Sequence, residues 1–483
     1  MKKFTFLLLA AIIAASGNAY TTKGDKSVYT FKTLSEIAES GVTAGENSTY
    51  TVANTLEIAA TDTLRLMNGD NVLLSSDVEV KVLGYADFTP SEGATFNRAS
   101  RFNNPLGVYF ESETAEGELD NVTFRYCGLR YAGKKDISIK NCKFYNVTTA
   151  LSSVGAIALS CSGNMTVTVE NCHFEDCEVP AIGGAANFTC GVTFKNNYME
   201  DCNMLNVNKP FVNITVGGDM PVVIDGNTVV GNKRTMVGGI GVSNLLNIEG
   251  TKNVYIRNND VRYCRYGVTT TGPMNAVISG NTLIENCYES NPLNGGSGIS
   301  VYDPYYKQTV MITGNRIEDN FWGVTVIGCK EANLGKTSVP EDDVTYNPGK
   351  NIFNNNGNGG VKYDLYNNST NTVYAQGNTW GVATQDENSI ESVIFHKKDD
   401  EKLGEVIYMP ASSGISKVDA THDVYYDATA DRVVLPKEAD AQVYTMNGAV
   451  VMAVKGVTAV DLSELNGGVY VVKACGKAIK VVK

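Results

Sequence analysis

The chain has 483 residues and a formal net charge of −12. A chain this acidic repels the phosphate backbone of nucleic acids, so we exclude non-specific nucleic-acid binding and expect no nucleic-acid partner. Glycine is abundant at 47 residues, and valine and isoleucine dominate the apolar set, which favours strands and turns over helices.

The first residues carry an export signal. Lys2 and Lys3 are followed by the uncharged apolar run 4–15, and Ala19 is a small residue at the end of the segment. This pattern predicts a signal peptide at residues 1–19, with an uncleaved N-terminal anchor as the alternative. No later stretch is apolar over the length that a membrane-spanning helix needs, so we expect no transmembrane segment in the mature chain.

Residues 20–49 are predicted to form an N-terminal cap. Thr33 and Glu36 have the spacing of a capping box, which predicts a short helix over residues 34–40. We expect this segment to cover the edge of the first strands, because an open edge invites the addition of further strands.

An internal repeat dominates residues 50–395. A short run of alternating β-formers is followed by a charged residue, an Asn- or Cys-containing bend and an apolar residue. The apolar residue recurs every 20 to 34 positions, at Phe124, Phe144, Phe174, Met199, Val229, Val261, Leu283 and Ile317. This period fits one coil of a solenoid, with like residues stacked from coil to coil. The sequence therefore predicts an all-β right-handed parallel β-helix, a single-stranded solenoid.

The repeat also explains the positions of most of the cysteines. One column of bend residues contains Cys142, Cys172, Asn197, Asn227, Asn259, Asn281 and Asn315. A second contains Cys127, Cys177, Cys202, Asn232, Cys264, Asn286 and Asn320. Asn side chains can hydrogen-bond to the same group one coil away, and cysteine is a small residue that tolerates burial. We therefore expect these six thiols to be reduced and buried, with no structural disulfide among them.

The repeat stops near residue 395. Residues 396–414 contain a charge run and a Pro-Ala-Ser-Ser-Gly stretch, and they are predicted to form a linker. Residues 415–483 contain short strand patterns separated by turns, which predict a small Ig-like β-sandwich.

This last region resembles a known sorting domain. The segments 443–451 and 460–483, which include Asp461-Leu462-Ser463 and a Lys-rich final strand, are similar to the C-terminal sorting domain of the type IX secretion system. The resemblance implies the type IX secretion machinery as a partner. It also implies an exported protein, located at the outer-membrane surface or extracellular.

The repeat region resembles the pectate-lyase-like β-helix superfamily, most clearly at residues 106–128 and 350–367. That superfamily includes polysaccharide lyases, glycosidases, esterases and non-catalytic adhesins, so the resemblance does not settle the function.

No catalytic motif stands out. The paired aspartates, Gly-His-Gly and Arg-Ile-Lys segments of polygalacturonase-type hydrolases are missing from the sequence, and the three histidines are His173, His396 and His422. Whether the protein is an enzyme stays open at this point. If the protein is an enzyme, the activity that would fit an acidic polysaccharide is that of a lyase with a Lys/Arg/Tyr centre.

Acidic pairs recur at equivalent positions of adjacent coils: Glu175 with Asp176, and Glu200 with Asp201. We interpret them as solvated carboxylates, with a Ca²⁺ site as the alternative. No other metal or cofactor site is indicated.

A candidate ligand face combines cations with aromatic rings. It consists of Arg262, Arg265, Tyr266, Tyr302 and Trp322, and Trp322 is expected in the column of Tyr266 two coils on. Sugars stack on aromatic faces, and arginine pairs with carboxylate or sulfate groups. The alternative interpretation is that Tyr266 and Trp322, each of which precedes a glycine turn, only cover the solenoid. The leading hypothesis is a monomeric surface or secreted protein that binds a complex polysaccharide or cell-surface glycan. The alternatives are a polysaccharide lyase and a structural adhesin.

Overall fold

The computed structural model describes residues 19–184, 189–216, 218–250, 252–291, 293–412, 425–427, 432–445, 449–466, 468–475 and 477–482. The chain divides into two compact units, with the boundary after Ser412. Residues 1–18 of the predicted signal peptide lie outside the described residues, so that peptide stays a prediction. In the part of the chain that is described, no helix has the length and apolar character needed to cross a membrane.

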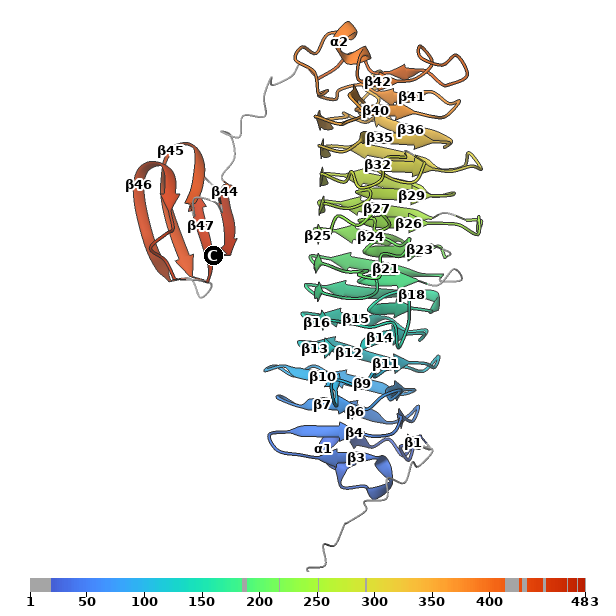
Figure 1. The fold of residues 1–483 in the computed structure, drawn as a ribbon, viewed down its shortest axis with the longest axis vertical. Helices are drawn as coiled ribbons and strands as arrows, with labels where there is room; N and C mark the ends of the chain where they lie inside the picture. The colour runs from blue at the N-terminus through green and yellow to red at the C-terminus, as the bar shows by residue number, and fades with distance from the viewer. Residues whose placement is uncertain are drawn as a thin grey trace, which may run out of the picture. The chain divides into compact units, whose positions relative to one another are not determined.

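The first unit is a stack of coils in which the chain visits three sheets in turn (Figure 1). Within the described residues, the sheets A, B and C contain 14, 14 and 13 strands. Neighbouring strands are parallel, except that β3 and β4 are antiparallel.

Sheet A consists of β1 (Tyr20–Thr21), β5 (Leu56–Ile58), β8 (Glu79–Val82), β11 (Gly107–Phe110), β14 (Gly128–Tyr131), β17 (Ile157–Leu159), β20 (Ile182–Gly184), β23 (Val212–Thr215), β26 (Ile240–Ser243), β29 (Val268–Thr271), β32 (Ser297–Tyr302), β35 (Trp322–Ile327), β40 (Leu365–Asn367) and β42 (Ile394–Phe395). Sheet B consists of β2 (Val28–Tyr29), β6 (Thr63–Arg65), β9 (Tyr85–Phe88), β12 (Glu116–Asp120), β15 (Ile137–Lys140), β18 (Ser162–Glu170), β21 (Thr189–Lys195), β24 (Val222–Asp225), β27 (Asn253–Arg257), β30 (Asn275–Ser279), β33 (Thr309–Thr313), β36 (Glu331–Gly335), β41 (Val373–Ala375) and β43 (Val406–Ile407). Sheet C consists of β3 (Val42–Ala44), β4 (Thr49–Val52), β7 (Asn71–Leu74), β10 (Ala94–Arg98), β13 (Val122–Arg125), β16 (Lys143–Tyr145), β19 (His173–Glu175), β22 (Tyr198–Glu200), β25 (Thr228–Val230), β28 (Asp260–Arg262), β31 (Thr282–Ile284), β34 (Arg316–Glu318) and β37 (Ile352–Asn354). A small hairpin pairs β38 (Gly357–Asn358) with β39 (Val361–Lys362).

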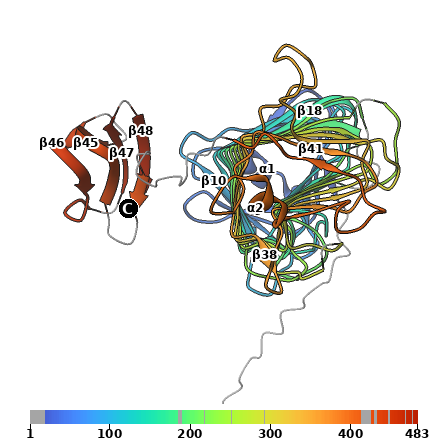
Figure 2. The same cartoon turned by 90° about the horizontal axis from the view of Figure 1, so that it is seen from above.

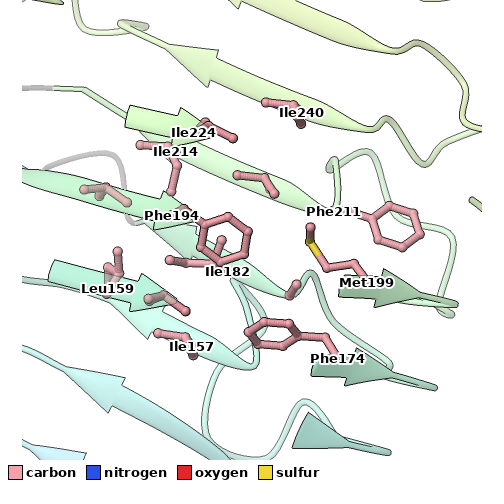
Figure 3. Close-up of a cluster of buried hydrophobic side chains, with 14 of the residues drawn as sticks. Ile157, Leu159, Phe174, Ile182, Phe194, Met199, Phe211, Ile214, Ile224 and Ile240 are labelled. Atoms are coloured by element: carbon pink, nitrogen blue, oxygen red, sulfur yellow. The ribbon is translucent and has the colours of Figure 1, made fainter. Parts of the chain in front are cut away.

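The interior is one continuous apolar cluster that extends from Tyr29 to Tyr408. Side chains from the three sheets point into it, as Figure 3 shows for Phe174, Phe194 and Ile182. The predicted apolar column is confirmed: its residues pair coil by coil in sheet C and are fully buried, namely Phe124, Phe144, Phe174, Met199, Val229, Val261, Leu283 and Ile317. The rings of the successive Phe residues stack with centroids 4.9 Å apart, close to the distance between paired strands.

A ladder of asparagine amides runs along the bend between sheets B and C. The Nδ2 of Asn259 donates to the Oδ1 of Asn281 at 2.9 Å, and the Nδ2 of Asn281 donates to the Oδ1 of Asn315 at 2.9 Å. The ladder runs through Asn197, Asn227, Asn259, Asn281, Asn315, Asn351 and Asn378. The predicted amide column is therefore confirmed, and it extends two residues further than expected.

The cysteines of both columns are buried, and all six are free thiols, as predicted for Cys127, Cys142, Cys172, Cys177, Cys202 and Cys264. Several donate to backbone carbonyls: the Sγ of Cys172, for example, lies 3.4 Å from the carbonyl oxygen of Glu170.

The N-terminal end differs from the prediction in detail. Helix α1 (Phe31–Ser35) is capped by Thr30, which accepts from the N–H of Thr33 at 3.1 Å. The predicted capping box at Thr33 and Glu36 is wrong, because the helix begins at Phe31 and the Thr33 Oγ1 instead accepts from the Thr30 N–H at 2.9 Å. A 3-10 turn, η1 (Ala38–Ser40), follows. Residues 20–49 also supply β1, β2 and β3, so the sheets begin before residue 50.

The C-terminal end of the solenoid also continues further than expected. Helix α2 (Glu387–Glu391) lies within the outline of the coils, as α1 does at the opposite end (Figure 2). The linker prediction is wrong for residues 396–412, because β43 pairs with β41 and His396 is buried. The His396 ring accepts from the Val406 N–H at 2.9 Å and contacts Glu391 at 3.0 Å.

The second unit has its own apolar cluster, which includes Val443, Leu462 and Val472. Its described residues form one antiparallel sheet: β44 (Tyr425–Asp427), β45 (Arg432–Thr445), β46 (Val450–Asp461), β47 (Val469–Ala474) and β48 (Lys477–Val482). Two of the short strands predicted from the sequence are joined in the 14-residue β45. The division into two sheets of a sandwich stays a prediction, and His422 lies outside the described residues.

Candidate functional site

The structure separates the predicted ligand residues. Arg262 is on the outer face of sheet C, and Arg265, Tyr266 and Trp322 lie along the edge where sheet C passes into sheet A. Tyr302 ends β32, on the other side of sheet A. The shared column of Tyr266 and Trp322 is confirmed, because residue 268 pairs with 299 and 299 pairs with 324. The column does not, however, form a sugar-stacking surface.

Trp322 is only 4% exposed. Its ring lies against Gly296, where a Cβ atom would fall 2.8 Å from the indole, and its centroid is 6.3 Å from that of Tyr363. The ring of Tyr266 packs in the same way against Gly238, and burial raises the pKa of its hydroxyl. Trp322 therefore covers the solenoid, as the alternative interpretation expects, and the half-buried Tyr266 ring packs in the same way, so the two rings offer no pair of open faces to successive sugars.

The two predicted arginines are already engaged. Arg262 forms a bidentate pair with Asp260, with distances of 2.6 and 2.9 Å, and this hydrogen bonding raises the pKa of the guanidinium. Arg265 is 6% exposed, and its Nη1 donates to the Oδ1 of Asn208 at 2.6 Å. The Arg265 guanidinium is enclosed, whereas the Arg262 side chain is 38% exposed and pairs with Asp260 on the outer face of sheet C.

Tyr302 lies on a different surface from the other four residues, near the edge where sheet A passes into sheet B. Three successive coils cross this edge with unequal loops: residues 244–252, 272–274 and 303–308. The short turn between two longer loops leaves a recess of about 220 Å³, which we call the corner pocket. It is lined by Asn247, Ile248, Glu249, Gly250, Lys252, Pro273, Met274, Asn275 and Lys307.

Buried polar side chains fix both walls of the corner pocket. Asp303 is fully buried, and its carboxylate accepts from the N–H groups of Tyr305 at 3.0 Å, Lys307 at 2.6 Å and Gln308 at 2.6 Å. On the opposite wall the buried Asn244 amide donates to the carbonyls of Ile248 and Pro273. Because each loop is tied to a buried anchor, the recess is formed before any ligand arrives.

The pocket contains two lysines in different electrostatic states. The Lys252 side chain is 2% exposed, and its Nζ is 3.1 Å from Asp219 and 2.7 Å from the Glu249 carbonyl. The Nζ of Lys307 donates to the Oδ1 of Asn247 at 3.2 Å, which joins the two loops across the recess. No carboxylate among the described residues forms an ion pair with Lys307, so its ammonium is available to an anion.

Exposed rings and apolar side chains lie on the same two loops and at the end of β32. Tyr302, Tyr305 and Tyr306 are 41%, 51% and 43% exposed. Leu245 and Leu246 are 62% and 56% exposed. A surface that combines open aromatic faces, amide groups and an unpaired ammonium can stack a sugar ring, bind its hydroxyls and neutralise an acidic substituent.

The acidic pairs have local partners. Glu175 contacts the His173 ring at 2.8 Å, and Glu200 accepts from the Tyr198 hydroxyl at 2.7 Å. Within the described ranges, no group of three or more His, Cys, Asp or Glu side chains is placed to hold a metal ion.

Residues 88–245 match the family model described as a right handed beta helix region. The solenoid is a right-handed parallel β-helix. No curated protein matches the sequence. Among solved structures, a double mutant of the periplasmic alginate epimerase AlgG is 13% identical, with 82% of this chain and 85% of that chain covered and a TM-score of 0.39. The unmutated AlgG structure is 12% identical, with 79% and 83% covered and a TM-score of 0.29. Likeness at this level identifies no substrate.

Reasoning from the sequence missed the corner pocket. A signal for it was present in the repeat spacing. The coil from Val261 to Leu283 is 22 residues long and lies between coils of 32 and 34 residues that start at Val229 and Leu283. A short coil between two long ones predicts a recess where their loops project.

Proposed function

We propose that this is an exported β-helix protein that binds an acidic polysaccharide, with one sugar unit in the corner pocket. The observation that carries the proposal is the juxtaposition of the Lys307 ammonium, which lines a preformed recess and has no carboxylate partner among the described residues, with the 51% exposed Tyr305 ring, whose centroid is 6.0 Å from the Lys307 Nζ. The pocket volume of about 220 Å³ suits a single ring rather than a longer segment. Neighbouring units of the chain would lie over the tyrosines.

The rigid walls support binding without a conformational change. The loops that carry Asn247 and Lys307 are each anchored by a buried side chain, so little conformational entropy is lost when a sugar is bound. Lys252 contributes a second positive charge, which Asp219 neutralises, and Glu249 in the lining carries a negative charge. The pocket therefore favours at most a singly charged unit, such as a uronate that pairs with Lys307, over a multiply sulfated one.

Affinity electrophoresis of the full mature chain through gels containing a polyuronate, a sulfated polysaccharide or a neutral glucan tests this function. We expect retardation by the polyuronate, and reduced retardation of the Lys307→Ala variant. Lys143→Ala, which removes an exposed lysine from sheet C, is the matched control and should behave like the wild type. Equal mobility in all gels would refute the proposal, and ultraviolet-absorbing unsaturated product would establish a lyase instead.

We also propose that residues 415–483 direct the protein through the type IX secretion machinery to the cell surface or the medium. The separate apolar cluster of this unit supports a domain that can be removed without opening the solenoid. Deletion of residues 415–483 should leave a folded protein in the periplasm. Normal arrival of the truncated chain at the surface would contradict the proposal.

A further inference from the structure

Two cysteines outside the bend columns approach each other across adjacent coils. Cys161 immediately precedes β18, and Cys190 lies in β21, the strand that pairs with β18. Their Sγ atoms are 3.1 Å apart. Both residues are buried, with 1% and 2% of their surfaces exposed. The pair is therefore shielded from solvent and needs a closure of only about 1 Å to reach the length of a disulfide bond.

The environment of this pair differs from that of the column cysteines. Cys172, Cys177, Cys202 and Cys264 each place Sγ within 3.4 to 3.7 Å of a backbone carbonyl oxygen. For Cys161 and Cys190, the contact recorded among the described residues is the one between their sulfur atoms. A buried thiol pair without carbonyl acceptors loses no hydrogen bond to the backbone when its protons are removed.

We propose that Cys161 and Cys190 form an intramolecular disulfide in the exported protein. The inference rests on the proposed export, because an oxidising compartment is where such bonds persist. A small-molecule disulfide is the oxidant. One cysteine thiolate attacks it, forming a mixed disulfide and releasing one thiol; the second cysteine then displaces the other thiol. The net change is two protein thiols and one disulfide converted into one protein disulfide and two small thiols.

The bond has to form while the chain folds. The hydrogen bond with Cys161, together with burial, raises the pKa of the Cys190 thiol far above its usual range. Thiolate is scarce once the pair is enclosed, so exchange is fast only before the coils close over it. The same enclosure then keeps reductants out, which makes the finished bond long-lived.

The bond would fasten an irregular part of sheet B. The pairing of β18 with β21 shifts register between Ser162 and Thr166, and Gly163 in that interval has a φ of 129°. In this stretch of β18, residues 162–164 are exposed and Met165 is buried. A covalent link across 29 positions restricts the unfolded chain and fixes the irregular stretch to the next coil.

The test uses the full chain purified without reductant from a host that exports it. The protein is denatured in N-ethylmaleimide, digested and analysed by mass spectrometry. We expect two of the eleven cysteines to remain unlabelled and to appear in one peptide pair that joins Cys161 to Cys190. Cys161→Ser should make Cys190 reactive, whereas Cys264→Ser, a column cysteine, should leave the linked pair intact.

A second preparation separates this inference from the proposal of export. Reduced, unfolded protein is refolded with glutathione disulfide, and the same linked pair should form without any secretion. Reduction of the refolded wild type should lower its melting temperature, while the Cys161→Ser/Cys190→Ser double variant should be insensitive to reductant. Complete labelling of both cysteines in both preparations, or linkage of either one to a different cysteine, would overturn the inference.

Discussion

Replacement of Asn281 by alanine in the middle of the amide ladder should destabilise the solenoid strongly. The Asn281 Oδ1 accepts from the backbone N–H and the Nδ2 of Asn259, at 3.0 and 2.9 Å. Its Nδ2 donates to the Ile256 carbonyl and to the Asn315 Oδ1, both at 2.9 Å. All four hydrogen bonds are buried, and the Asn259 N–H would be left without an acceptor. At about 1 kcal/mol each, their loss predicts a decrease of about 4 kcal/mol in the free energy of unfolding.

Urea unfolding followed by tryptophan fluorescence measures this change, because the chain has two tryptophans and both, Trp322 and Trp380, are buried in the solenoid. Asn354→Ala is the matched control, since Asn354 is exposed on the outer face of sheet C, and its free energy of unfolding should stay within about 0.5 kcal/mol of the wild type. A loss below about 1 kcal/mol for Asn281→Ala would show that the ladder sets the register of the coils without stabilising them.

Three further changes have defined outcomes. Both amide atoms of Asn232 are buried without a partner among the described residues. Asn232→Cys, which matches Cys202 and Cys264 in its column, should therefore raise the free energy of unfolding by about 1 kcal/mol. A decrease in that free energy would mean that water satisfies the amide. Burial raises the pKa of Asp364 to about 6 from 3.8, so the folded state binds a proton more tightly than the unfolded state. Relative to Asp364→Asn, the wild type should lose about 3 kcal/mol of its free energy of unfolding in urea titrations as the pH rises from about 3 to 7, and parallel curves would refute this. Trp322→Ala should lower the free energy of unfolding by about 3 to 5 kcal/mol, and calorimetry should show an unchanged affinity for polyuronate. Weaker binding by a folded variant would show that the Trp322 ring contacts the ligand.

The stacking of the coils could be predicted because it depends on residue types at one repeated position. Phe144, Phe174 and Met199 fall in one column whatever the loops between them do, since the inward positions of parallel strands must coincide for the core to close. The amide column follows from the same periodicity. The end of the solenoid was less predictable, because residues 396–412 join the sheets through only two paired positions and a buried His396.

The candidate site could be predicted only in part. The register of Tyr266 and Trp322 was right, but a register does not reveal what covers a side chain, and Gly296 from the long loop of the neighbouring coil lies over the Trp322 ring. The corner pocket arises from the difference in loop length between coils and from buried anchors such as Asp303. The anchors lie in the loops outside the repeated phrase, so the repeat does not reveal them, and the unequal coil lengths are the one signal of the recess that the sequence offers.

Calorimetric titration of a polyuronate oligosaccharide at several salt concentrations tests the central claim most directly. With the full mature chain, Lys307→Ala should weaken binding about tenfold at low salt and reduce the dependence of the dissociation constant on salt, because one charge-assisted contact is lost. Tyr305→Ala should weaken binding by a similar factor with the salt dependence unchanged, since stacking involves dispersion and desolvation. Wild-type affinity and salt dependence in both folded variants would contradict the assignment of the corner pocket as the glycan site.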